Sequence, residues 1–170
     1  MKDALALYKL IVLYMLDRVD FPLTKAQIGD FILEKEYTNF MTLQRAISEM
    51  IDDKLVTAQS FRNRTHLKLT KDGRDTVHFF ANDISSEIRA EIDEYFKENS
   101  LELRNEVSIV SDYYKTTGGD YEAHLVAKDK EVPLVDLTMT VPLEETAASI
   151  CDNWTKKNQE IYQYLVKQLF

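Results

Sequence analysis

The sequence predicts an α+β protein in which three helices and a β-hairpin come first, a connecting helix follows, and a three-stranded antiparallel sheet with a long terminal helix ends the chain. Two observations predict this layout. Apolar residues recur at three- and four-residue spacing through most of the first 100 residues and again after residue 142, as in amphipathic helices. Between about residues 107 and 141 they alternate with polar residues, which is typical of half-buried strands.

The first 53 residues predict three helices. The first runs from Asp3, an available N-cap, to Arg18, and its apolar stripe is wide enough to be buried on most sides or to reach a partner subunit. Thr24-x-x-Gln27 matches a capping box and opens a short second helix. The third helix runs from about Asn39 to Asp53 and has one apolar face. The polar side chains on its other face are Thr42, Gln44, Arg45, Ser48 and Glu49.

A β-hairpin and a fourth helix are predicted next. Two strands, 55–61 and 65–70, are joined by the polar turn Arg62-Asn63-Arg64, and Asn63 suits the turn because it tolerates a left-handed backbone. Residues 71–74 then lead into a helix that contains Val77, Phe79 and Phe80. The order is therefore helix, helix, helix, hairpin, helix.

This order and two motifs resemble a winged helix-turn-helix. Asp53-Lys54-Leu55-Val56 resembles the usual entry into the first wing strand, and residues 66–74, which contain Leu69-Thr70-x-x-Gly73, resemble the exit from the wing in multiple-antibiotic-resistance-type and phenolic-acid-decarboxylase-type regulators. The resemblance covers roughly residues 1–80. The whole chain also resembles a bacterial family of winged-helix regulators that has no assigned ligand.

The resemblance implies that the third helix enters the major groove of DNA and that the hairpin lies against the phosphates or the minor groove. Arg45 is suited to guanine and Gln44 to adenine, while Thr38 and Asn39 start the helix where backbone N–H groups can hold a phosphate. The other expected DNA contacts are Thr42 and Ser48 on the same helix, Lys25 on the second helix, and Arg62, Asn63, Arg64, His66 and Lys68 on the wing. Ordinary solvent exposure is the alternative explanation for these polar residues.

The second half predicts a connecting helix and a separate sheet. A helix is expected from Asp83 to Asn99, then strands near residues 107–113, 121–125 and 135–141, with a hairpin turn at Gly118-Gly119. A long helix from about Leu143 to Leu169 follows, with an apolar stripe that includes both of these leucines. We expect three parts: a DNA-binding domain (1–81), a connecting or dimerisation helix (82–100) and a βββα assembly or sensing domain (101–170).

Charge and composition restrict the partners. The net charge is −8, but Lys and Arg number 12 against 11 Asp and Glu in residues 1–80, and 9 against 18 in residues 81–170. The first part can therefore carry a basic face towards DNA, while the acidic part is repelled by phosphates. No apolar run reaches the length of a membrane span, and a single cysteine, Cys151, fits a reducing cytoplasm.

The expected function is sequence-specific binding of double-stranded DNA by a homodimeric transcriptional regulator associated with the nucleoid. Catalysis, a metal and a cofactor are not expected, because the three histidines fall in different elements and no glycine-rich phosphate loop is present. A small-molecule effector stays open, since the aromatic residues of the second half can line a pocket or fill the core. The alternative function is a winged helix that binds protein in a larger assembly without contacting DNA.

Overall fold

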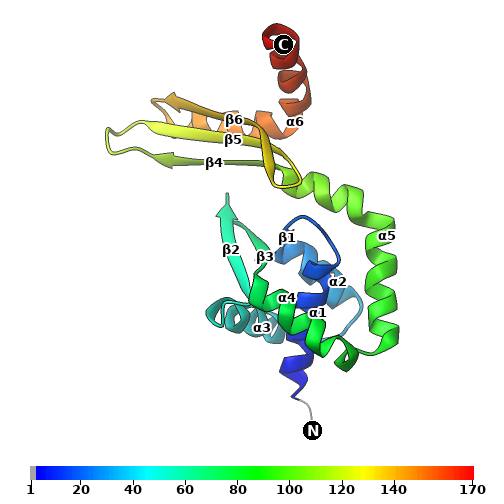
Figure 1. Ribbon diagram of the computed structural model, residues 1–170. Coiled ribbons are helices and arrows are strands. Elements are labelled where there is room, and N and C mark those ends of the chain that lie inside the picture. The colour runs from blue at the N-terminus through cyan, green and yellow to red at the C-terminus, as the bar shows by residue number, and fades with distance from the viewer. Residues whose placement is uncertain (1–2) are drawn as a thin grey trace. The chain divides into compact units, whose positions relative to one another are not determined.

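The computed structural model describes residues 3–170 and divides them into two compact units, with the boundary between Val107 and Ser108 (Figure 1). The elements of the first unit are α1 (Ala4–Asp17), β1 (Leu23–Thr24), α2 (Lys25–Glu34), α3 (Phe40–Asp52), β2 (Val56–Phe61), β3 (Arg64–Leu69), α4 (Lys71–Phe80), the 3₁₀ helix η1 (Ala81–Asp83) and α5 (Ser86–Ser108). The second unit contains β4 (Ile109–Lys115), β5 (Tyr121–Asp129), β6 (Val132–Val141) and α6 (Glu144–Leu169). The predicted α+β layout is confirmed.

Side-chain caps set the starts of several helices. The Asp3 carboxylate accepts from the Leu5 N–H, and Thr24 and Gln27 form both hydrogen bonds of the predicted capping box. Thr70 caps α4, because its Oγ1 accepts from the Gly73 N–H at 3.0 Å. Each cap satisfies a backbone donor that the first turn of a helix leaves unpaired.

The sheet of the first unit has the strand order β1-β3-β2, with all neighbours antiparallel. Its hairpin closes at the pair Phe61 and Arg64, so that Arg62 and Asn63 form a two-residue turn, with φ angles of 47° and 70°. Two left-handed residues in such a turn match the right-handed twist of the strands, and the predicted hairpin is confirmed. The sequence pattern did not predict β1, which is only two residues long and pairs along β3.

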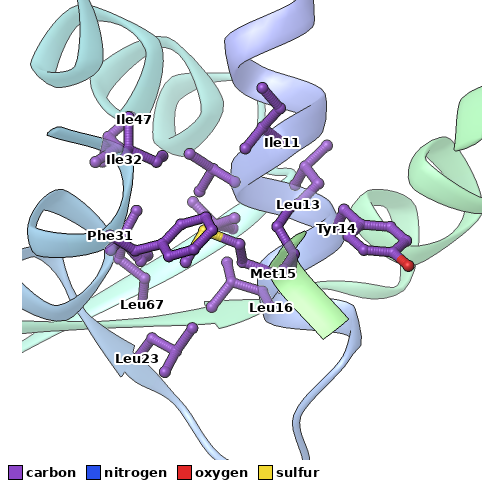
Figure 2. Packing of buried hydrophobic residues seen from close by; sticks show 14 of the residues in the cluster. Ile11, Leu13, Tyr14, Met15, Leu16, Leu23, Phe31, Ile32, Ile47 and Leu67 are labelled. Atoms are coloured by element: carbon purple, nitrogen blue, oxygen red, sulfur yellow. The ribbon is translucent and has the colours of Figure 1, made fainter. Parts of the chain in front are cut away.

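Helix α1 lies at the centre of the first unit. Residues 11–16 are six consecutive buried positions, which is more than one face of a helix, and α1 packs against α3, α4 and β3. Figure 2 shows Met15 pointing towards Phe31 of α2, while Tyr14 points away from Phe31. The Tyr14 hydroxyl donates to the Asp93 carboxylate on α5 at 3.0 Å. The wide apolar stripe of α1 is thus buried within its own unit.

Helix α5 is longer than predicted. It begins at Ser86, where the hydroxyl of the preceding Ser85 accepts a hydrogen bond from the Ile88 N–H. It continues to Ser108 instead of ending near Asn99. Val107, which the alternating pattern placed in a strand, is on the helix and buried. The physical reason is packing: the buried residues of α5, Ile92, Phe96, Leu103 and Val107, continue a helical spacing and all join the core of the first unit.

The second unit is a β4-β5-β6 meander with α6 across one face of the sheet, as predicted (Figure 1). The buried Trp154 indole of α6 donates to the Val126 carbonyl at 3.2 Å, and the Gly118-Gly119 turn connects β4 to β5. The predicted stripe of α6 is wrong at both ends, since Leu143 and Leu169 are 60% and 75% exposed. A helix of 26 residues is about 39 Å long, whereas strands of 7 to 10 residues span about 23 to 33 Å, so the sheet cannot cover all of α6.

Candidate nucleic-acid interface

Helix α3 has a sharply divided surface. Its buried residues, Leu43, Ala46, Ile47 and Met50, lie along one side and belong to the helix face turned towards the core. At 100° per residue, Met41, Arg45 and Ser48 fall on the opposite side, and all three are exposed. The face available to a partner therefore presents a thioether, a guanidinium and a hydroxyl in one row, while the predicted contacts Thr42 and Gln44 flank it and are half-buried.

The start of α3 is held by Asn39. Its Oδ1 accepts from the Thr42 N–H at 2.9 Å, so the side chain caps the helix and one of the terminal backbone donors is used internally. Thr38, the other residue expected to hold a phosphate here, is half-buried. The cap gives Asn39 a structural role that the sequence reasoning did not assign to it.

Arg45 belongs to a short chain of charges. Its Nε lies 3.6 Å from the Glu49 carboxylate, and the Lys9 ammonium on α1 lies 3.0 Å from the other oxygen of that carboxylate. The hydrogen bond from Lys9 is the main cause that lowers the pKa of Glu49. The Arg45 side chain is 70% exposed, and an exposed pair four residues apart is worth only about 0.3–0.5 kcal/mol, so a phosphate or a guanine competes easily for this guanidinium.

The wing presents three of the four basic residues that were expected to contact DNA. Arg64 and Lys68 are exposed on β3 and Arg62 is half-buried at the turn, but His66 is only 7% exposed, so the structure does not present its side chain for the expected contact. The reason is the strand β1 that the sequence did not predict. Because β1 and β2 flank β3, His66 pairs with Thr24 and Gln59, and the Phe61 ring packs edge-on against its imidazole at 5.1 Å.

A groove of about 710 Å³ separates the wing turn from the helices of the same unit. Its lining residues come from α2, α3, the turn and the last part of α5, and they include the cations Lys25 and Arg64 and the carboxylates Asp30 and Glu106. Glu106 is fixed there by Gln27, whose Nε2 donates to it at 2.7 Å. Sequence reasoning missed Glu106 because it ended the connecting helix near Asn99, and this carboxylate makes the groove less basic than the wing cations alone would.

The histidines and the cysteine do not form a shared site. His78 pairs with Asp17 at 2.9 Å, His124 pairs with Asp136 in the second unit at 2.6 Å, and Cys151 is fully buried. Within residues 3–170, no group of three His, Cys, Asp or Glu side chains is arranged to hold a metal ion. Of the aromatic residues considered for a pocket, Trp154 is buried in the core, whereas Tyr114 and Tyr164 are 51% and 63% exposed.

Comparison with known proteins places the chain in a family. No curated protein and no solved structure matches it. No helix in the described part of the chain is long and apolar enough to cross a membrane. A family model described as "Domain of unknown function (DUF4364)" matches residues 8–169, which is nearly the whole chain, and the protein therefore belongs to this family.

Proposed function

We propose that this protein is a transcriptional regulator that binds double-stranded DNA sequence-specifically, with α3 in the major groove and the wing on the backbone or in the minor groove. One observation carries the proposal: Asn63 and Arg64 of the wing line the same groove as Phe40 and Gln44 of α3, the helix whose exposed row includes Arg45. A helix of this width fits the major groove, and guanidinium groups bind phosphates and the guanine edge in bidentate fashion.

The turn geometry supports the role of the wing. Both turn residues adopt left-handed backbone conformations, and a side chain other than glycine or asparagine does so at some cost. Glycine would fit the Arg62 position with less strain, and the arginine supplies a charge there. An arginine at this strained position is expected where its charge contributes to binding.

Genome-wide capture of DNA fragments by the purified protein tests the proposal. The comparison uses wild type and the double variant Arg62→Ala plus Arg64→Ala at near-physiological salt. A matched control, Lys156→Ala plus Lys157→Ala on the exposed surface of α6, also removes two positive charges, but from the second unit. We expect a short palindromic sequence to be enriched by wild type and by the control, and to be lost with the wing variant.

A protein-binding winged helix is the second candidate, and the mixed charge of the groove favours it. Asp30 and Glu106 line this groove together with Lys25 and Arg64, and their negative charges weaken its attraction for phosphates. Failure of wild type to enrich any DNA, together with recovery of a stoichiometric protein partner, would support this function instead.

A homodimer is part of the proposal. Two weak half-site contacts combine through effective concentration, which compensates for an α3 face with a single arginine. The apolar stripes of α1 and α5 are used inside the first unit, so the exposed side chains Tyr164, Leu169 and Phe170 at the end of α6 are better candidates for the contact. Light scattering at micromolar concentration should give twice the 19.8 kDa chain mass, and a monomer mass would contradict this part.

The proposal also places the protein in the cytoplasm, at the nucleoid, and gives it no catalytic role.

A further inference from the structure

An exposed methionine begins the exposed row of side chains on α3, in the first turn of the helix. Met41 is 76% exposed, and its neighbour Phe40, which lines the groove, is 58% exposed. Leu43, only two residues further along, packs fully into the core, whereas Met41 does not. The core does not account for this placement of Met41.

The neighbours of Met41 indicate what it contacts. Arg45 and Ser48 lie four and seven residues further along, so the three side chains form one row on the same face. A partner of this row must offer a hydrogen-bond acceptor for the guanidinium and an apolar group for the methionine within about 10 Å along the helix. The major groove offers both, since guanine presents O6 and N7 acceptors and thymine presents a 5-methyl group.

We propose that Met41 reads the 5-methyl group of thymine, so that the preferred DNA carries thymine opposite the first turn of α3. This inference rests on the proposed function and adds a specificity determinant to it. The first turn is the correct place for such a contact, because the N-terminal residues of a recognition helix are the ones that reach base edges. The flexible thioether adapts to a methyl group without the fixed geometry that a hydrogen bond requires.

Removal of the methyl group alone tests the inference. Pooled genomic fragments are amplified with dTTP or with dUTP, and the fragment that wild type enriches most is then titrated in both forms by fluorescence anisotropy. Uracil pairs as thymine does and lacks the methyl group. Burial of one methyl group is worth about 0.8 kcal/mol, so wild type should bind the thymine form roughly fourfold more tightly for each contacted methyl group.

The variants are Met41→Ala and Met41→Gln, with Leu101→Ala on α5 as the control. Leu101 is an equally exposed apolar residue of the same unit, at 70% exposure, and it is not part of the α3 face. Both Met41 variants should bind the two DNA forms nearly equally, and the control should keep the fourfold preference. Circular dichroism confirms that each variant is folded, and Met41→Gln preserves the side-chain length if the shorter residue alters α3.

The outcomes separate the inference from the function on which it rests. Equal binding of both DNA forms by wild type would overturn the role of Met41 and leave DNA binding intact. A preference that persists in both Met41 variants would overturn it as well, because another residue would then read the methyl group. Absence of binding to either form would overturn the proposed function together with the inference.

Discussion

Replacement of Gly73 by alanine should destabilise the first unit, although alanine is the better helix former. Gly73 lies in the first turn of α4 and is buried. A Cβ atom at this position would lie 2.1 Å from the Leu55 carbonyl oxygen and 2.9 Å from Leu69 Cδ1. The Leu55 carbonyl is held in place, because it accepts from the Thr70 N–H at 3.1 Å and lies 2.9 Å from the Thr70 hydroxyl.

The magnitude follows from two opposing effects. Helix propensity favours alanine by up to about 1 kcal/mol. Overpacking against fixed backbone costs about 1–3 kcal/mol, and weakening the hydrogen bonds between Thr70 and Leu55 adds about 1 kcal/mol. The net expectation is a loss of about 1–3 kcal/mol in the free energy of unfolding.

Gly29 provides the matched control for this prediction. It lies inside α2, and a Cβ atom there would meet only Leu43 Cδ2, at the ordinary contact distance of 3.9 Å. Gly29→Ala should therefore stabilise the protein by about 0.5–1 kcal/mol, through helix propensity and the lower entropy of the unfolded chain.

Urea denaturation of the full chain measures both variants. Circular dichroism at 222 nm follows the helices, and the fluorescence of Trp154, the only tryptophan, follows the second unit separately. We expect the midpoint to fall for Gly73→Ala and to rise for Gly29→Ala. Shifts of the same sign in the two variants would refute the reasoning, because they would show that the Leu55 carbonyl does not restrict this position.

Three further predictions concern charge and packing. Glu49→Gln removes the carboxylate that pairs with Arg45 and should raise the affinity for DNA about twofold, as measured by anisotropy at fixed salt; unchanged affinity would argue against a role for Arg45. Burial and the hydrogen bond to Glu91 raise the pKa of Tyr37 above its usual 10.0, so the folded protein keeps a proton that the unfolded chain loses. The free energy of unfolding should therefore hold below about pH 10 and decline as the pH rises further, and the decline should be smaller in Tyr37→Phe. Trp154→Phe removes the donor to the Val126 carbonyl and part of the buried ring, and should cost about 2–4 kcal/mol in urea denaturation; a cost below about 1 kcal/mol would contradict the packing of α6 on the sheet.

Local sequence signals predicted most of the fold. The capping box at Thr24 and the turn at Gly118-Gly119 each depend on a few adjacent residues, and both are confirmed. The end of α5 was wrong because residues near Val107 carry apolar side chains at spacings that suit either a strand or a helix. The choice was made by long-range packing against the core of the first unit, which no local pattern contains.

The candidate site was also predictable only where local sequence signals determine it. The exposed row on α3 follows directly from helical periodicity, and the wing cations follow from strand alternation. His66 obeys the same alternation, but a two-residue strand from elsewhere in the chain flanks it, and so short a strand has no periodicity to detect. Glu106 joins the groove only because α5 continues beyond its predicted end.

The salt dependence of DNA binding tests the central claim most directly. The affinity for the enriched duplex is measured between about 50 and 200 mM salt for wild type, the Arg62→Ala plus Arg64→Ala variant and the Lys156→Ala plus Lys157→Ala control. Each phosphate contact contributes about 0.9 to the slope of log K against log salt, so loss of two contacts should reduce the slope by about 1.8 per protomer in the wing variant and leave it unchanged in the control. Equal slopes in all three proteins, or no measurable binding by wild type, would contradict the account of the wing as a phosphate-binding element.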